Sequence, residues 1–297
     1  MAFSVYNDSE QGAAFTLIIV TLPICILSTI LRFTSTRHSE RKVGLEDWFA
    51  LLALLFYLGY VGLLTSILVL MNGRNVFELG ELPLSTVTAI FKLGYVMNEM
   101  DPGNQTFAKL SLLALYYRFF SSSRKFAYWV YFVGTAQVMW YISIFWVRWF
   151  ACLPVSSTWD LTEAGTCINQ NAFFASTESI NSAIDFVMVG MAIWMVKSLR
   201  LSIKTKWQLS FVFMLGGFSG VVGIIKIAEA YGSIGSNIEN AIWNVVQLAC
   251  SIICCCAPIY KSMFSNMSLL RGFGSSFRSG MNSWKSRKSS SEGSSPL

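Results

Sequence analysis

The sequence is poor in charged residues and almost devoid of histidine. Only 13% of its 297 residues are charged, and it has one histidine, His38, whereas soluble domains carry about 25% charged residues. One histidine leaves no Ser-His-Asp set to assemble, and the scattered cysteines show no metal-ligand spacing. There is no glycine-rich phosphate loop either. We therefore expect no metal site and no cofactor.

The sequence is rich in long apolar segments. Hydrophobic residues make up 54% of the chain, and its mean hydropathy is +0.53. A soluble domain of this length would not contain several apolar runs of about 20 residues, each long enough to cross a bilayer. The net charge of +6 lies in loops and in the C-terminal tail, which indicates membrane orientation and not a nucleic-acid partner. The sequence thus predicts an all-α, multi-pass membrane protein.

Seven membrane helices can be placed along the chain. Residues 1–11 are polar and lack lysine and arginine, so we expect a retained first helix and not a cleaved signal peptide. Residues 261–297 are basic and rich in serine, and the first part of this tail is amphipathic and suited to an anionic lipid surface. We expect the seven spans at about residues 12–33, 47–71, 94–119, 126–150, 171–196, 208–231 and 237–260.

The distribution of basic residues predicts the orientation of the bundle. Lysine and arginine cluster after the first, third, fifth and seventh spans and are nearly absent after the second, fourth and sixth. Because basic loops face the cytosol, we expect the N-terminus outside and the C-terminus in the cytosol. The membrane would be the plasma membrane or another membrane of the secretory pathway. Asn7 then begins a glycosylation sequon, Asn7-Asp8-Ser9, on the outer side.

The loop between the fourth and fifth spans contains Cys152 and Cys167. It is predicted to lie outside, where disulfides form and persist. A bridge across this short span would stabilise the fold by about 3 kcal/mol in the chain-entropy model. We expect a disulfide that holds the loop as a lid over the outer mouth of the bundle.

The third span carries ionisable residues that a lipid-facing helix could not tolerate. Asp101, Gln105 and Lys109 follow at i, i+4 and i+8, so they share one helical face. A charged group at the centre of a bilayer costs about 2.5–3.5 kcal/mol on insertion scales, so this face must point into the bundle. Pro102 and Gly103 are expected to kink the helix or to end a short outer extension.

Two further spans carry polar stripes of the same kind. These stripes favour a polar ligand cavity, or alternatively interhelical pairs that fix the register, such as Lys109 with Asp185. Their members are Glu178, Asn181 and Asp185 in the fifth span, and Asn240, Asn244, Gln247 and Ser251 in the seventh.

The sixth span has two notable features. Gly216, Gly220 and Gly223 lie along one edge, and small residues of this kind allow helices to pack closely within a bundle. Lys226 and Glu229 lie near its outer end, where long charged side chains can reach the membrane surface. We therefore expect these two residues to be structural and solvated.

Several short motifs are similar to those of one family. Glu46-Asp47-Trp48 opens the second span, and Lys109-Leu110-Ser111 leads to Tyr117-Arg118-Phe119-Phe120 in the third. The others are Cys152-x-Pro154, Trp159-Asp160 and Cys167 in the outer loop, Asn181 with Asp185 in the fifth span, and Trp243 with Pro258 in the seventh. Over about residues 32–261 the chain resembles the fungal rhodopsin-like integral membrane family.

The resemblance implies a seven-helix membrane bundle, yet without retinal. Microbial rhodopsins hold retinal on a lysine in the middle of the seventh helix, and residues 237–260 contain no lysine. The chain departs from the family pattern at three points. No proline follows Asp185 closely, Lys226 stands where an arginine is usual, and Gln247 stands where an acid is common.

Two functions fit these observations. Since the resemblance extends to surface-cue receptors, the first is a receptor-like protein that binds a small or lipidic ligand and meets a cytosolic signalling partner through its inner loops and tail. Since it also extends to a member encoded with mycotoxin biosynthesis genes, the second is a membrane enzyme or accessory protein of secondary metabolism. In an enzyme, the acid and base would be drawn from Glu99, Asp101, Glu178 and Asp185. The residues expected to bind the ligand are Asp101, Gln105, Lys109, Glu178, Asn181, Asp185, Trp243, Asn244 and Gln247.

Overall fold

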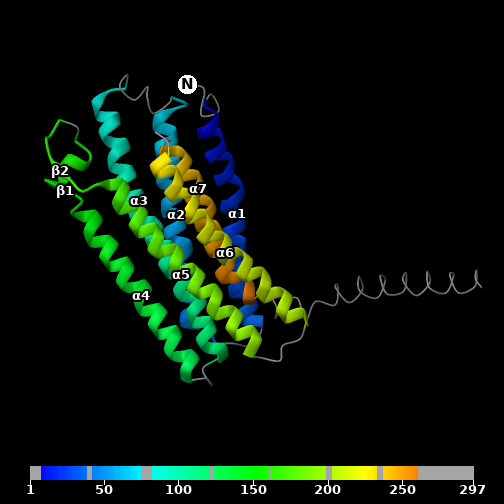
Figure 1. Ribbon diagram of the computed structural model, residues 1–297. Coiled ribbons are helices and arrows are strands. Elements are labelled where there is room, and N and C mark those ends of the chain that lie inside the picture. The colour runs from blue at the N-terminus through cyan, green and yellow to red at the C-terminus, as the bar shows by residue number, and fades with distance from the viewer. Residues whose placement is uncertain are drawn as a thin grey trace, which may run out of the picture.

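In the part of the chain that the computed structural model describes, seven α-helices form a single bundle (Figure 1). The structure describes residues 8–38, 42–74, 82–120, 124–160, 162–198, 203–232 and 237–259. The predicted all-α, seven-helix membrane fold is confirmed, while Asn7 and the tail at 261–297 lie outside the described residues. The helices are α1 (Ser9–His38), α2 (Leu45–Met71), α3 (Leu84–Phe120), α4 (Arg124–Trp149), α5 (Gln170–Ser198), α6 (Ile203–Gly232) and α7 (Asn237–Cys256).

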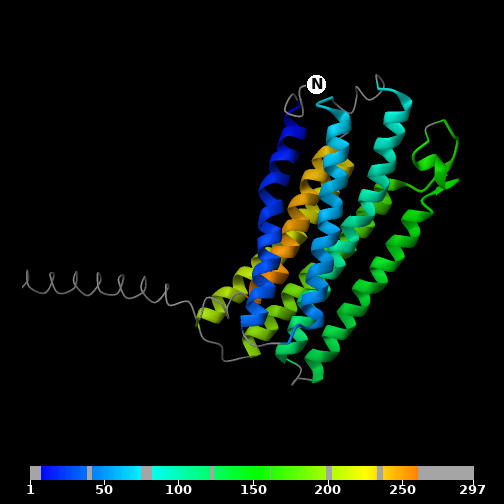
Figure 2. The same ribbon diagram turned by 180° about the vertical axis from the view of Figure 1, so that it is seen from behind.

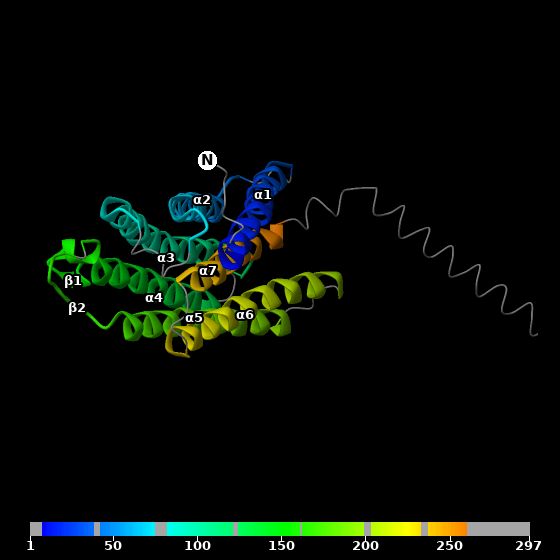
Figure 3. The same ribbon diagram turned by 90° about the horizontal axis from the view of Figure 1, so that it is seen from above.

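α7 occupies the interior of the bundle. Seen from above, it lies between α1 and α3 on one side and α6 on the other (Figure 3), and it contacts all three, as well as α2. Its residues Val245, Leu248 and Ile252 are completely buried. α1 to α4 lie side by side in chain order (Figure 2), so α4 stands at the edge of the bundle. Of the polar stripe that was predicted on α7, Asn244 and Gln247 are buried, whereas Asn240 and Ser251 are half-buried.

The composition of the helices agrees with a membrane location. Among the described residues, α1, α2, α4 and Ile238–Cys256 of α7 are long and apolar enough to cross a bilayer. α3 and α5, with 37 and 29 residues, are also long enough to cross a bilayer, but they carry ionisable groups that lower their hydropathy. Lys109 of α3 and Glu178 and Asp185 of α5 are buried among the helices, as the cost of charge in a bilayer requires.

α3 is longer than the expected span and begins well before it, at Leu84. Its 37 residues correspond to about 55 Å at 1.5 Å per residue, so the helix projects beyond a hydrocarbon core of about 30 Å. The helix runs through Pro102 without a break. Proline cannot donate to the carbonyl of Asn98 four residues earlier, and Arg148 of α4 donates its Nη1 to that carbonyl instead. The unmet backbone acceptor thus becomes a link between α3 and α4.

The acidic pair of the second span caps α2. The helix begins after Gly44, whose backbone N–H donates to Asp47 Oδ2 at 3.2 Å. Carboxylates at this position also interact favourably with the positive end of the helix dipole. At the other end, Asn72 adopts the left-handed conformation with φ of 48°, and its N–H donates to the Leu68 carbonyl. This arrangement is a common way to end a helix.

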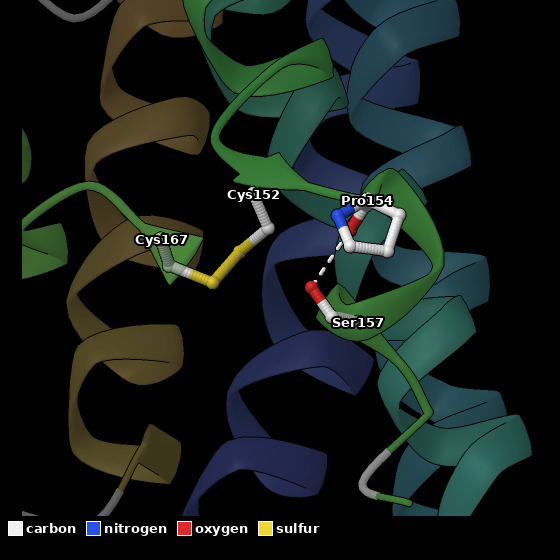
Figure 4. Close-up of a disulfide and its surroundings, with 4 residues drawn as sticks. All are labelled: Cys152, Pro154, Ser157 and Cys167. Atoms are coloured by element: carbon white, nitrogen blue, oxygen red, sulfur yellow. Dashed lines mark hydrogen bonds between the residues drawn. A yellow bond between two sulfur atoms is a disulfide. The ribbon is translucent and has the colours of Figure 1, made fainter. Parts of the chain in front are cut away.

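A disulfide closes the loop between α4 and α5, as predicted. β1 (Cys152–Leu153) pairs antiparallel with β2 (Thr166–Cys167), and Cys152 is bonded to Cys167 (Figure 4). Between them, the short helix η3 (Val155–Thr158) is fastened by Ser157, whose Oγ donates to the Pro154 carbonyl at 2.7 Å (Figure 4). The hydroxyl and backbone N–H of Thr162 donate to Asp160, which lowers the pKa of that carboxyl. The loop is thus tied together internally.

The glycine edge of α6 packs closely against α5. A Cβ on Gly220 would lie 3.1 Å from the ring of Phe186, and one on Gly216 would lie 3.4 Å from Val189. The tightest position is Gly223, where a Cβ would lie 2.2 Å from the Oγ of Ser182 and 2.9 Å from a carboxylate oxygen of Glu178. The small residues therefore serve packing within the bundle, as the sequence predicts.

Replacing Gly223 with alanine is expected to destabilise the bundle by about 1–3 kcal/mol, because overpacking forces α5 and α6 apart. Gly217→Ala is the matched control, since nothing lies within 4 Å of a Cβ at that position of the same helix. Thermal unfolding of both variants in the same detergent provides the comparison. Equal unfolding temperatures for the two variants would contradict the close approach at Gly223.

Candidate functional site

A first buried ion pair joins α3 to α5. The ammonium of Lys109 lies 3.0 Å from Asp185 Oδ1. The same group donates to the side-chain oxygen of Asn181 at 2.6 Å and to its backbone carbonyl at 3.0 Å. Ser219 of α6 donates to the other oxygen of Asp185 at 3.3 Å. Three predicted site residues are therefore brought together, in the interhelical pairing that the sequence allowed as an alternative to a ligand cavity.

A second buried ion pair joins α5, α6 and α7. The ammonium of Lys226 lies 3.2 Å from Glu178 Oε2 and donates to Gln247 Oε1 at 2.7 Å. Gln247 in turn donates to Glu178 Oε1 at 3.0 Å. The ring of Phe174 lies below the ammonium, with its centroid at 5.6 Å. Lys226 thus has a carboxylate, an amide oxygen and an aromatic face as neighbours.

The expectation for Lys226 is therefore wrong. It was expected to reach the membrane surface, but its exposed fraction is 0%. The physical reason is that Glu178 and Gln247 on neighbouring helices lie at the same depth and replace the water that the ammonium would otherwise seek. Glu229, one turn further along α6, is half-buried and accepts a hydrogen bond from Trp243 Nε1 at 2.9 Å.

The remaining predicted site residues occupy different surroundings. Gln105 accepts a hydrogen bond from Ser251 of α7 at 3.1 Å, which connects α3 to α7. Asp101 and Asn244 each have a buried oxygen that receives no hydrogen bond from the described residues. Both lie near the fully buried hydroxyl of Tyr60 on α2. Trp243 points to Glu229 and does not join either ion pair.

A recess opens beside the first ion pair. Its cavity volume is about 40 Å³, and the empty space there is about 470 Å³ when the open solvent at its mouth is included. Lys109, Asp185, Ser219 and Ser251 supply its polar wall, and the rest of the lining is apolar or sulfur-containing. Of its four half-buried lining residues, Val189, Leu215 and Gly216 belong to α5 and α6, and Ser251 belongs to α7. The other lining residues are Ala108, Leu112, Tyr116, Met188, Cys254 and Cys255.

A third cluster lies at the opposite end of the bundle from the disulfide loop. Arg32 of α1, with an exposed fraction of 0%, donates its Nε to Asp47 Oδ1 at 2.8 Å and its Nη1 to the Cys255 carbonyl at 2.7 Å. Glu46 pairs with Arg118 of α3, and its backbone carbonyl accepts a hydrogen bond from Ser111 at 2.6 Å. The motif residues Glu46, Asp47, Ser111 and Arg118 thus hold α1, α2, α3 and α7 together.

Sequence reasoning missed the role of Arg32. The residue stands at the end of the first apolar run and reads as the first member of a basic loop. A signal was nevertheless present, because an arginine and an acidic pair flank a short connection between two spans. Such a pairing becomes visible only when the helices are known to pack with these ends adjacent.

Comparison with known proteins identifies relatives of this chain. The family described as Fungal rhodopsin domain matches residues 31–266. A protein named Satratoxin biosynthesis SC1 cluster protein 4, from Stachybotrys chartarum, is 48% identical over 175 residues, which cover 58% of this chain and 65% of the relative. No solved structure matches the chain.

Two further relatives extend the comparison. Wortmanamides biosynthesis cluster protein C from Talaromyces wortmannii is 31% identical over 301 residues, covering 99% of this chain and 81% of the relative. A SAT4 family membrane protein from Emericella nidulans is 27% identical over 161 residues, covering 52% of this chain and 41% of the relative. The chain thus spans less than two thirds of the satratoxin-cluster relative and a larger share of the wortmanamide-cluster relative.

Proposed function

The chain belongs to the fungal rhodopsin domain family, and from that premise we propose that it binds a small, largely apolar molecule in the recess beside Lys109 and Asp185. The recess supports this proposal because it combines apolar walls with one polar wall, which is the usual composition of a small-molecule site. Its ligand would carry a polar group at one end. That group would interact with the ion pair and with the hydroxyls of Ser219 and Ser251.

The open side of the recess favours a ligand that arrives through the bilayer. Three of the four half-buried lining residues, Val189, Leu215 and Gly216, belong to α5 and α6, and on the same two helices Val187 and Met214 are exposed, as lipid-facing side chains are in a membrane bundle. A molecule dissolved in the membrane could therefore enter between α5 and α6 without crossing an aqueous loop. This route suits a lipidic compound better than a charged, water-soluble one.

The names of the relatives support a ligand from secondary metabolism. Two of them are named for the satratoxin and wortmanamide biosynthesis clusters, and we extend only the general class to this chain. In this proposal the protein receives or holds such a compound in the plasma membrane or another secretory-pathway membrane. The N-terminus would lie outside and the C-terminus in the cytosol, where a signalling partner could meet the inner loops.

An enzyme of secondary metabolism is the second candidate, and one observation favours it. Glu99 and Asp101 have buried carboxylate oxygens that receive no hydrogen bond from the described residues. Such groups could exchange a proton with a substrate. Glu178 and Asp185 suit this role less, because each is paired with a lysine ammonium.

Filling the recess is expected to abolish ligand binding. Gly216→Leu places a bulky side chain in its border, and Ala108→Leu fills it from α3 on the opposite wall. Gly217→Leu is the matched control, because open space surrounds that position. Fractions of an organic extract of the fungal host should raise the unfolding temperature of the wild type and of the control, but not of the two filled variants.

The same incubations separate binding from catalysis. If the extract stabilises the protein and its components remain unchanged by mass spectrometry, the binding function is supported. Consumption of a component that is lost in Glu99→Gln or Asp101→Asn would establish the enzyme instead. Equal stabilisation of the wild type and both filled variants would place the ligand outside the recess and contradict the proposal.

A further inference from the structure

Glu99 lies in an unusual environment at the outer part of α3. Both of its carboxylate oxygens are shielded from solvent, and neither accepts a hydrogen bond from the described residues. Its neighbours include Tyr95, Tyr141 and Arg148. Glu178 and Asp185 in the bundle centre each have a lysine partner, so Glu99 differs from them. A shielded carboxylate without a donor is costly, and such a group calls for a partner that the protein itself does not supply.

Arg148 is the nearest candidate partner within the chain, but it is used elsewhere. Its Nη1 donates to the carbonyl of Asn98, the acceptor that Pro102 leaves without its usual helical donor. The guanidinium is therefore held by the backbone of α3. It contributes positive potential near Glu99 without a hydrogen bond to the carboxylate.

Aromatic rings gather one turn away from this carboxylate. Tyr95 is four residues before Glu99, so the two side chains share a face of α3. The Tyr95 ring meets Trp149 of α4 at 6.1 Å and 79° and Trp159 of the disulfide loop at 5.5 Å and 70° between ring planes. Both are edge-to-face contacts, in which ring faces stay available to another group. Three separate parts of the chain thus contribute to one aromatic cluster.

One face of this cluster already holds a cation. The ammonium of Lys92 lies 5.9 Å from the centroid of the Trp159 ring, within the range of a cation–π interaction. Lys92 itself is exposed and lies two turns before Glu99 on α3. It could withdraw into water when a different cation approaches. The cluster therefore combines a ring face suited to positive charge with an unpaired carboxylate.

We propose that Tyr95, Glu99, Trp149 and Trp159 form a binding site for a small organic ammonium ion beneath the disulfide loop. The ring faces would contact the alkyl groups of the ammonium, and Glu99 would neutralise its charge. The Cys152–Cys167 bridge matters to this site because it fixes the loop that carries Trp159. The site is separate from the recess beside Lys109, so either can exist without the other.

Choline is a suitable probe, and its neutral carbon isostere dimethylbutanol is the control for shape. We expect choline, but not the isostere, to bind the full chain in lipid nanodiscs, as measured by calorimetric titration. Glu99→Gln should weaken choline binding by about tenfold or more, because it removes the shielded carboxylate that would neutralise the ammonium. Glu163→Gln should leave binding unchanged, since Glu163 is an exposed acid of the same loop.

The variant Lys92→Gln distinguishes a cation-binding site from a merely structural cluster. Removing the resident ammonium from the Trp159 face should strengthen choline binding several-fold, a result that loss of a merely structural residue would not produce. Gly216→Leu should leave choline binding intact, which keeps this test independent of the recess. Equal binding of choline and dimethylbutanol would overturn the proposal, and so would unchanged choline affinity in a folded Glu99→Gln variant.

Discussion

Replacing Lys226 with methionine is expected to lower the free energy of unfolding by about 3–5 kcal/mol, because it leaves a buried carboxylate without its counter-charge. Glu178 would keep one hydrogen bond from Gln247, but it would lose the ammonium that now lies 3.2 Å away. Gln247 would also lose the donor to its side-chain oxygen. Unfolding of the detergent-solubilised protein by denaturant provides the measurement.

A second substitution tests the cause of this loss. In Lys226→Met/Glu178→Gln both charges are removed, and Gln247 can still donate to the new amide oxygen. We expect the double variant to recover most of the lost stability, since replacing both members of a buried pair is often nearly neutral. Lys125→Met removes an exposed lysine and should change stability by no more than about 0.5 kcal/mol. A double variant as unstable as the single one would argue against a desolvated ion pair.

Replacing Arg32 with methionine is expected to have an effect of similar size, about 3–5 kcal/mol, because Asp47 would become an uncompensated buried charge. The guanidinium joins three helices, since it extends from α1 to Asp47 of α2 and to the Cys255 carbonyl of α7. Arg32→Lys should recover only part of the loss, because one ammonium cannot reproduce two diverging N–H donors. Thermal unfolding of each variant in one detergent ranks the effects.

Arg37→Met is the matched control for Arg32, because Arg37 lies on the same helix and is exposed. It should leave the unfolding temperature almost unchanged. A further check uses the double variant Arg32→Met/Asp47→Asn, in which the negative charge of the Asp47 side chain is removed together with its arginine partner. An Arg32→Met variant as stable as Arg37→Met would show that the cluster at Arg32 does not hold these helices together.

The fold could be predicted from the sequence because membrane helices have a strong local signature. Apolar runs marked the spans, and the two cysteines of one loop marked the disulfide. The start of α3 was missed because the span was limited to the length that crosses the hydrocarbon core, whereas the helix already begins at Leu84. Helix and membrane span coincide only where the helix ends at the bilayer surface, and α3 continues beyond it.

The polar interior was only partly predictable for a physical reason. The spacing of Asp101, Gln105 and Lys109 shows that they share a face, but periodicity does not report which helix that face meets. Lys226 illustrates the limit, because its depth depends on the tilt of α6 and on partners from two other helices. The pairing of Lys109 with Asp185 was foreseen as one alternative, whereas the recess beside it depends on the space that side chains leave unfilled.

The most direct measurement of the proposed function is native mass spectrometry of the protein purified from its fungal host in mild detergent. We expect wild type and Gly217→Leu to carry a bound small molecule whose fragments identify a lipidic secondary metabolite. The two filled variants, Gly216→Leu and Ala108→Leu, should be recovered folded but without it. Recovery of the same bound compound with all four proteins would contradict a binding site in the recess beside Lys109 and Asp185, as would its absence from the wild type.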